Sequence, residues 1–353
     1  MVKVFLILLF SCSSRADVHL DQIKLPPHFR ISIFAKGLKN PRQMVWGAKG
    51  TLFVGTRDND KVYAIGPNGK VSVVASGLNM PNGVAFKDGD LYVAEISRIL
   101  RFKKIEEHLK DPPSFDVIFD KYPTDKHHGW KFIAFGPDGK LYVPIGAPCN
   151  ICEPQDPYAS ITTLNTQTGE MEIFARGVRN SVGFDWNPIN HDLWFTDNGR
   201  DLLGDDIPPD ELNHASGFGM NFGYPYCHGG DILDPDVGRD HKCSDYTKPV
   251  QKLGAHVASL GMTFYTGTKF PKEYKNQIFI AEHGSWNRSK KSGYRVTLVK
   301  INSKGEALRY EPFATGWLKG EDNWGRPVDV LNTPDGGLLI SDDLADVIYK
   351  IAY

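Results

Sequence analysis

The feature that most constrains the fold of this chain is a β-hairpin pattern that recurs six times. Each copy has an apolar segment, a turn containing Gly or Asp, and a second apolar triplet, as in "FIAFGPDGKLYV". Such turns join antiparallel strands, and regular repeats of short strands are typical of β-propellers. The copies occupy residues 40–54, 80–93, 128–143, 179–195, 260–280 and 326–340. We therefore predict an all-β fold, a six-bladed β-propeller, in preference to a β-sandwich, which would not need six similar hairpins.

The two ends of the repeated region are expected to share a blade. The early run "FRISIFAKGL" and the last run "DVIYKIAY" both have strand character, and pairing them closes the ring. The widest spacing between repeats, from Leu193 to Ile278, predicts a long insertion between blades four and five. One propeller domain over residues 22–353 then accounts for the whole repeated region.

Residues 1–16 have the features of a secretory signal peptide. Lys3 supplies a charge, a short apolar core follows, and Ser14 and Ala16 are small residues suited to cleavage. The core is too short to span a bilayer, and no other stretch is long and apolar enough for a membrane span. An alternative is a lipid anchor at Cys12. The protein is accordingly expected to be exported, either periplasmic or secreted.

The charge balance argues against a nucleic acid partner. The chain has 41 Lys or Arg against 42 Asp or Glu, a net charge of −1. Binding to a phosphate backbone relies on an excess of basic side chains. The composition is that of a globular protein instead.

Four cysteines remain after cleavage at Ala16, and an even number in an exported chain suggests two disulfides. Three pairings are open. Proximity in the sequence favours Cys149–Cys152 and Cys227–Cys243. The "CNIC" pair also has the spacing of a redox or zinc motif, but no second such pair accompanies it.

Polar residues recur where each first strand begins and each second strand ends, and propeller geometry puts both points on one face. Several arginines that converge on one channel mouth indicate an anionic ligand, and histidines there offer a base near neutral pH. Each residue alone is also compatible with an ordinary surface position. The strand starts carry Arg42, Asn82, His128, Arg179, Asn180, His256 and Arg326.

The acidic stretch "FTDNGRDLLGDDIPPDELN" at residues 195–213 leaves the same mouth. Its spacing does not fit an EF-hand loop. Gly199 permits a sharp turn that aims backbone carbonyls at a cation. The carboxylates of residues 205–211 are expected to shape the insertion or to hold a secondary ion.

Taken together, these motifs resemble the glucose/sorbosone dehydrogenase family, closest to its L-sorbosone dehydrogenase-like members. The resemblance spans nearly the whole mature chain and implies a propeller that holds pyrroloquinoline quinone over the channel with Ca²⁺. The motifs that carry it are "HHGWKFIAFGPDGKLYVPIGAPCNIC", "GVRNSVGFDWNP", "LWFTDNGRDLLGDDIPPDELN", "NFGYPYCHGG", "AEHGSWNRSKKSGYRV" and "GRPVDV".

The resemblance also implies residue roles. The catalytic base would be His128, with His127 as the alternative. Arg179 and Asn180 would contact the quinone, and Arg179 would also stabilise its reduced oxygens.

Two further positions follow from the same motifs. Arg326 would bind the cofactor, and the carbonyls of Gly199 and Arg200 would hold the cation. Relatives have a second Arg where this chain has Val328, and glucose-specific enzymes have a Gln where it has Val182. The cofactor carboxylates would then need other partners, for which the candidates are Arg42, Arg288 and His256.

The implied activity is oxidation of a sugar-type alcohol or aldehyde hydrate, with electrons passing to an exported acceptor such as a cytochrome. Two other classes remain open. A Ca²⁺-dependent lactonase would place a cation in the same channel, and a non-catalytic propeller would bind a glycan or a protein.

Overall fold

A computed structural model describes residues 17–353 of the chain. The signal peptide predicted over residues 1–16 and the lipid anchor predicted at Cys12 lie outside the described residues. None of the helices in the described part of the chain has the length and apolarity that a membrane crossing requires.

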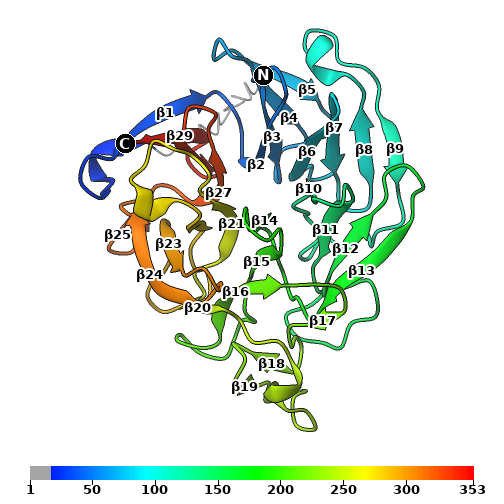
Figure 1. The fold of residues 1–353 in the computed structure, drawn as a ribbon, viewed down its shortest axis with the longest axis vertical. Coiled ribbons are helices and arrows are strands. Elements are labelled where there is room, and N and C mark those ends of the chain that lie inside the picture. Colours follow the sequence, from blue (N-terminus) through cyan, green and yellow to red (C-terminus); the bar gives the residue numbers. More distant parts are fainter. Residues whose placement is uncertain (1–16) are drawn as a thin grey trace, which may run out of the picture.

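Six β-sheets are arranged around a central axis as the blades of a propeller (Figure 1), which confirms the predicted fold class. Each sheet runs outward from a first strand that lies next to the first strands of its neighbours. Blade one consists of β2 (Pro41–Trp46), β3 (Leu52–Thr56), β4 (Val62–Ile65) and β5 (Val71–Ala75). Blade two consists of β6 (Gly83–Lys87), β7 (Asp90–Ala94), β8 (Ile99–Phe102) and β9 (Asp116–Phe119). The first four strands of blade three are β10 (Ala134–Phe135), β11 (Leu141–Ile145), β12 (Ser160–Leu164) and β13 (Met171–Arg176).

The other three blades follow the same order. Blade four is β14 (Phe184–Trp186), β15 (Leu193–Asp197), β16 (Pro209–Ala215) and β20 (Gln251–Ala255); blade five is β21 (Ser259–Phe264), β22 (Ile278–Glu282), β23 (Arg295–Ile301) and β24 (Ala307–Ala314); blade six is β27 (Pro327–Asn332), β28 (Leu338–Asp342), β29 (Val347–Ala352) and β1 (Arg30–Lys36). Two hairpin strands, β25 (Leu318–Lys319) and β26 (Asp322–Asn323), and four 3₁₀ turns, η1 (Leu20–Gln22), η2 (Ile105–Glu107), η3 (Cys243–Asp245) and η4 (Lys272–Tyr274), lie in connections.

The apolar triplets of the repeat form the second strand of each blade. Strands β3, β11, β15, β22 and β28 are buried at every residue. Neighbouring blades cover both faces of these strands, so their sequences are continuous apolar runs rather than alternating ones. The core is correspondingly divided into clusters between adjacent blades.

The two ends of the chain meet in blade six, as the sequence predicted. Strand β1 pairs antiparallel with β29, with Ile31 opposite Ile351 and a bulge between Ile33 and Ala35. Figure 1 shows the first and last strands side by side at the ring's seam. An early segment thus supplies the outermost strand of the last blade and closes the ring.

The long insertion lies inside blade four. The sequence predicted it between blades four and five, but β20 returns after the insertion to pair with β16 and completes blade four. Within it, β17 (Met220–Asn221) pairs in parallel with β13 and adds a fifth strand to blade three. The hairpin of β18 (Cys227–His228) and β19 (Ile232–Leu233) extends outward from the ring (Figure 1).

The ring closure gives a first prediction. Ile351 is fully buried in the core that joins blades five and six. Because truncation leaves a cavity there, Ile351→Ala should lower the free energy of unfolding by about 2–5 kcal/mol in a denaturant titration. Leu308→Ala on the exposed side of β24, where the side chain is 67% exposed, should change it by about 0.5 kcal/mol or less. An equal loss of unfolding free energy in the two variants would contradict a stabilising role for the core beneath the β1–β29 pairing.

Candidate active site

A cavity of about 370 Å³ opens where the first strands converge. Blades one, three, four, five and six contribute to its wall, which carries four arginines and four histidines. The wall is formed by Arg42, Arg57, His127, His128, Trp130, Arg179, Asn180, Asn198, Gly199, Asp201, Asp210, His256, Ala258, Leu260, His283, Gly284, Trp286 and Arg326.

Buried aspartates fix the strand starts that face this cavity. Asp197, at the end of β15, accepts hydrogen bonds from the backbone N–H of Arg179 at 2.8 Å and of Asn180 at 2.6 Å. Asp342, at the end of β28, accepts one from the backbone N–H of Arg326 at 2.9 Å. The hairpin repeat therefore sets the backbone position of each arginine. Burial raises the pKa of Asp197 to about 8 and that of Asp342 to about 7.

Arg326 carries a charge that no acidic side chain neutralises among residues 17–353. Its guanidinium donates to the backbone carbonyls of His283 at 3.1 Å and Gly284 at 2.9 Å. Arg57 lies with its guanidinium 4.8 Å from the centre of the Trp130 ring, a cation–π arrangement. Arg326 therefore adds positive potential to the cavity, whereas the charge of Arg57 is partly neutralised by Asp58, whose Oδ2 lies 2.8 Å from Arg57 Nη2.

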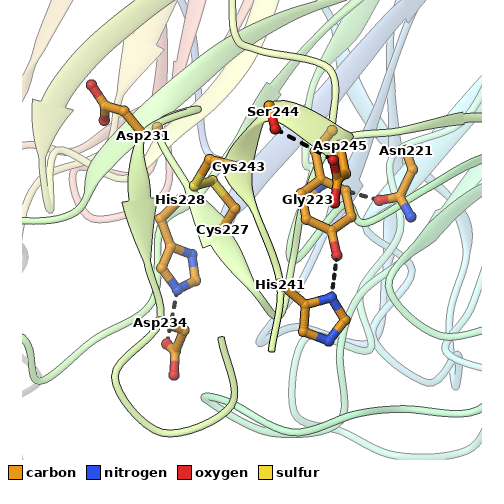
Figure 2. The surroundings of a disulfide bond; sticks show 12 residues. Asn221, Gly223, Cys227, His228, Asp231, Asp234, His241, Cys243, Ser244 and Asp245 are labelled. Atoms are coloured by element: carbon orange, nitrogen blue, oxygen red, sulfur yellow. Dashed lines mark hydrogen bonds and ion pairs between the residues drawn. A yellow bond between two sulfur atoms is a disulfide. The ribbon is translucent and has the colours of Figure 1, made fainter. Parts of the chain in front are cut away.

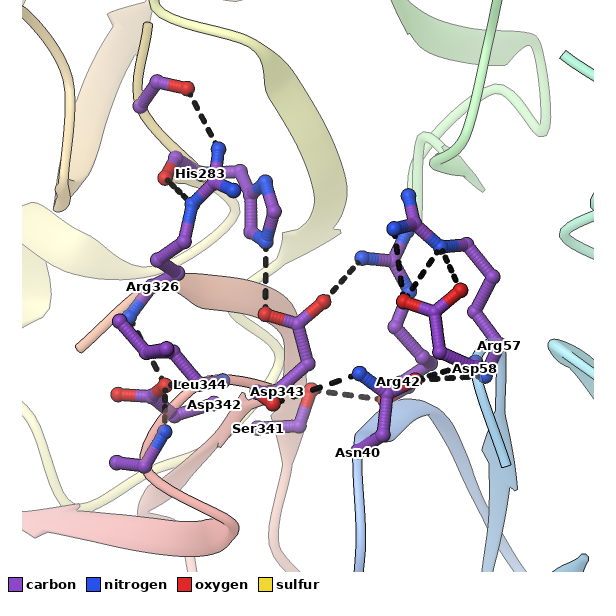
Figure 3. Close-up of polar contacts among 12 residues, drawn as sticks. Asn40, Arg42, Arg57, Asp58, His283, Arg326, Ser341, Asp342, Asp343 and Leu344 are labelled. Carbon is purple, nitrogen blue, oxygen red and sulfur yellow. Dashed lines mark hydrogen bonds and ion pairs between the residues drawn. The ribbon is translucent and has the colours of Figure 1, made fainter. Parts of the chain in front are cut away.

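A buried chain of polar contacts, which includes the Arg42–Asp343 ion pair, links blades five, six and one at the same wall (Figure 3). His283 Nε2 lies 2.8 Å from Asp343 Oδ1, and Arg42 Nη1 donates to Asp343 Oδ2 at 2.7 Å. Burial would raise the pKa of Asp343, but His283 and Arg42 hold it well below its usual range. Burial lowers the pKa of His283 to about 4, despite the opposing effect of Asp343. Arg42 also donates to Asn82 Oδ1 at 2.9 Å.

His128 has a fixed tautomer. Its Nδ1 lies 2.9 Å from the carbonyl oxygen of Ala147, which only accepts, so Nδ1 carries the proton and Nε2 keeps a lone pair. Burial, then the charges of Arg179 and His127, lower the pKa of His128 to about 2. The imidazole is therefore neutral at any ordinary pH.

The close packing of His128 depends on a glycine. A Cβ at Gly146 would lie 2.5 Å from the Cβ of His128. His127 is exposed, and its ring centre lies 4.0 Å from that of His128. Both histidines line the cavity, but the structure fixes the orientation of His128 more strongly.

Two of the predicted cofactor partners hold a loop at the mouth. His256 lines the cavity, and its Nε2 lies 2.7 Å from the carbonyl oxygen of Gly204. Arg288 is not part of the cavity wall; it donates to the carbonyl of Asp205 at 3.0 Å and to the carboxylate of Asp206 at 2.8 Å. Arg288 therefore fixes the loop after β15 instead of facing the cavity.

The side chain of Arg200 turns away from the cavity into the insertion. Its Nη1 donates to Asp234 at 2.5 Å and to Asp236 at 3.0 Å. Asp234 also contacts His228 Nε2 at 2.9 Å, beside the disulfide of the insertion (Figure 2). Only the backbone of Arg200 remains as a candidate cation ligand.

The acidic stretch divides into two parts. The exposed carboxylate of Asp206 binds Arg288, and the half-buried carboxylate of Asp205 accepts from the backbone N–H of Ser289. Asp210, by contrast, is buried in β16 and accepts from the backbone N–H of Gly199 at 3.0 Å. The carbonyl of Gly199, on the cavity wall, accepts from Arg179 Nη1 at 2.9 Å. In the part of the chain described, no three His, Cys, Asp or Glu side chains form a metal-ligand group.

The structure contains the two disulfides that sequence proximity favoured. Cys149 is bonded to Cys152 in the loop after β11, and Cys227 is bonded to Cys243 in the insertion (Figure 2). The first closes a short loop against the cavity wall, and the second ties the β18–β19 hairpin to η3.

The two positions at which this sequence differs from the family motifs, Val182 and Val328, lie in one cluster. Val182 and Val328 are buried in a small apolar cluster with Leu260, and Trp130 packs on it. Leu260 and Trp130 form part of the cavity wall, whereas the two valines lie behind them. The floor of the cavity is thus apolar where the motif would otherwise supply polar groups.

Several wall residues were not singled out from the sequence. His283 directly follows the second strand β22, and the sequence placed that strand end at the mouth without giving His283 a role of its own. Trp130 and Asp201 have no such positional signal. Their place in the wall depends on how the loops fold over the mouth.

Comparisons with known proteins agree with this architecture. Residues 92–346 match the family described as Glucose / Sorbosone dehydrogenase. A protein of Borreliella burgdorferi described as uncharacterized is 37% identical over 98% of this chain and 95% of its own length. A calcium structure of a Trichoderma reesei protein of carbohydrate-active enzyme family AA12 has a TM-score of 0.81 at 20% identity, covering 96% of this chain and 99% of that one.

A second solved structure has the same fold. The holo form of the pyranose dehydrogenase PQQ domain from Coprinopsis cinerea has a TM-score of 0.78 at 18% identity, covering 94% of this chain and 97% of that one. The matched residues include the hairpins that carry His128, Arg179, Asn180 and Arg326. The family match covers most of the chain, and its relatives share the same propeller over almost their full length. The chain therefore belongs to the glucose/sorbosone dehydrogenase family.

Proposed function

We propose that the protein is an exported oxidoreductase that oxidises a sugar or sugar-derived alcohol or aldehyde, with pyrroloquinoline quinone as hydride acceptor and Ca²⁺ as its partner ion. The observation that carries the proposal is the concentration of Arg42, Arg57, Arg179 and Arg326 on one cavity of a family propeller. Guanidinium groups are suited to carboxylates, which pyrroloquinoline quinone carries.

The residues present fit such a cofactor. A cavity of about 370 Å³ lies within the usual range for small-molecule sites. Its apolar floor at Leu260 and Trp130 suits the face of a flat ring, and the uncompensated charge of Arg326 suits an anion. The indole Nε1 of Trp130 is buried without a hydrogen-bond partner among the described residues, so the wall keeps an unused donor.

When bound, the quinone supplies an electrophilic carbonyl carbon for hydride, and Ca²⁺ supplies Lewis acidity. His128 Nε2 would accept the proton of the substrate hydroxyl. Arg179, Asn180 and Arg326 would hold the anionic cofactor. The carbonyls of Gly199 and Arg200 are the proposed protein ligands of the cation, and its binding would require Arg179 Nη1 to give up its 2.9 Å hydrogen bond to the Gly199 carbonyl.

Two observations favour His128 over His127 as the base. The Nδ1 contact with Ala147 leaves the lone pair of Nε2 free, and His128 is held in one orientation on the cavity wall. His127 is exposed to solvent. The disulfides support an oxidising compartment, where the electrons would leave to an exported acceptor such as a cytochrome.

Reconstitution tests the activity. Purified protein supplied with pyrroloquinoline quinone and Ca²⁺ should reduce a dye acceptor when aldoses are added, and a chelator should abolish the reduction. Binding of no quinone, together with hydrolysis of lactones in its absence, would instead establish a lactonase. Ligand binding without turnover under any condition would establish a binding protein.

Removing the uncompensated arginine should weaken the quinone complex. Arg326→Ala is expected to raise the dissociation constant about 10–100-fold, because a charge-assisted hydrogen bond contributes about 1.5–3 kcal/mol. Tryptophan fluorescence during a quinone titration measures it. Arg309→Ala, in the exposed part of β24, is the control and should leave the constant unchanged. An unaltered constant for Arg326→Ala would remove this residue from the cofactor site.

The identity of the base can be tested by amide substitution. His128→Gln should lower kcat by about 10²–10⁴-fold with a quinone dissociation constant near that of the wild type. His127→Gln should retain most of the turnover, and His108→Gln, at an exposed site, should retain all of it. The opposite ranking of His128 and His127 would make His127 the base.

The pH profile should also differ from that of an ordinary histidine enzyme. Because the pKa of His128 lies near 2 rather than about 6.5, Nε2 stays unprotonated on acidification, and kcat/KM should be nearly constant from pH 7 to pH 5. The stability due to burying neutral His128 is present above about pH 6.5 and declines as pH falls toward the folded pKa. Thermal unfolding at each pH separates that decline from catalysis. A half-loss of kcat/KM near pH 6.5 in folded protein would contradict the prediction.

A further inference from the structure

Asn150 connects the Cys149–Cys152 loop to the buried guanidinium of Arg179. Arg179 Nε donates to the backbone carbonyl of Asn150 at 3.0 Å, and Nη2 donates to Asn150 Oδ1 at 2.9 Å. The asparagine also exchanges two hydrogen bonds with the backbone of Asp201: Asp201 N donates to Oδ1 at 2.8 Å, and Nδ2 donates to the Asp201 carbonyl at 3.0 Å. One residue therefore ties Arg179 to the loop that follows β15.

The rest of the guanidinium is held from the other side. Nη1 donates to the carbonyls of Gly199 at 2.9 Å and Asn198 at 3.2 Å, and Nη2 also lies 3.3 Å from Asp201 Oδ2. An arginine has five N–H donors, and here each has an acceptor within the protein. Arg179 is thus set in one orientation, from which it presents its charge to the cavity.

The loop that carries Asn150 has no regular secondary structure of its own. The disulfide between Cys149 and Cys152, three residues apart, is its internal cross-link, and Cys149 Sγ lies 3.4 Å from the hydroxyl of Tyr224. A disulfide that closes so short a loop removes less entropy from the unfolded chain than one closing a long loop. Its main effect is expected to be local, on the direction of the Asn150 carbonyl and side chain.

We propose that Asn150 is a positioning residue for Arg179 and that the Cys149–Cys152 disulfide keeps Asn150 in place, so that a thiol reductant releases Arg179. The inference rests on the proposed function only in making Arg179 a cofactor contact. In the reduction, a dithiol supplies two electrons, the S–S bond breaks, Cys149 and Cys152 become thiols, and the dithiol becomes a disulfide.

The position of Arg179 can be measured without any quinone. Phenylglyoxal modifies accessible arginines, and peptide mass spectrometry gives the rate at Arg179 relative to that at Arg326 in the same sample. Asn150→Ala should raise this ratio several-fold, whereas Asn150→Asp, which retains the acceptor oxygen, should keep it near the wild-type value. An unchanged ratio in Asn150→Ala would overturn the role of Asn150.

The matched control is Asn165→Ala. Asn165 Oδ1 likewise accepts two backbone N–H groups in a loop, those of Gln167 at 3.0 Å and Thr168 at 3.3 Å, but the residue lies outside the cavity wall. This variant should leave the ratio unchanged. A rise equal to that of Asn150→Ala would show a general loosening and would overturn the proposal, and circular dichroism confirms that each variant is folded.

The disulfide is tested with dithiothreitol. Reduction should raise the Arg179 ratio in the wild type, and the double variant Cys149→Ser with Cys152→Ser should show the raised ratio already and respond no further. If the double variant still responds, the effect comes from Cys227–Cys243 and the disulfide part of the proposal is wrong.

A quinone titration links the result to the proposed function. Asn150→Ala should raise the dissociation constant of the quinone about tenfold. This is roughly the effect of losing one charge-assisted hydrogen bond, which is expected when Arg179 is no longer held in its orientation. If the wild-type protein binds no quinone, the proposed function fails, while the phenylglyoxal ratio still decides whether Asn150 positions Arg179.

Discussion

The pairing of β1 with β29 is the constraint on which the remaining structure depends. It joins the beginning and the end of the repeated region in one sheet and so fixes the number of blades around the axis. Only a closed ring brings the starts of five first strands to a single cavity. The candidate active site is in this sense a consequence of closure, since its side chains come from five blades that are far apart in the sequence.

Within the closed ring, buried carboxylates fix the backbone positions of two arginines at the channel mouth. Asp197 and Asp342 each end a second strand and bind the backbone of the arginine that begins the neighbouring first strand. Burial favours the protonated form of these carboxyls, and the backbone N–H groups oppose it. The protein thereby holds Arg179 and Arg326 by their backbones and leaves their guanidinium groups to loops around the mouth.

Each of those loops contacts a different group at the mouth. The Cys149–Cys152 loop contacts Arg179, the loop of residues 201–206 is held by His256 and Arg288, and the insertion receives the side chain of Arg200. The acidic stretch at residues 195–213 serves two purposes: the exposed carboxylate of Asp206 binds Arg288, and the buried carboxylate of Asp210 supports the turn at Gly199. Among the mouth arginines, Arg42 is paired with Asp343 and Arg179 with Asp201, so the uncompensated positive charge in the described part of the chain comes from Arg326.

The sequence by itself determined the repeat architecture, the pairing of the chain ends and several of the polar residues at the mouth, and it favoured the observed disulfide pairing over the two others. These follow from local signals, namely the hairpin period, strand-end positions and cysteine proximity. Only the tertiary structure decided the rest: the insertion inside blade four, the apolar floor of Leu260 and Trp130 packed on Val182 and Val328, and the chain from Arg42 through Asp343 to His283. Arg42 and Asp343 are 301 positions apart, and His283 and Asp343 are 60 apart. Contacts at such separations leave no periodic trace in a single sequence, because they arise only when the ring has closed and its loops have packed over the channel.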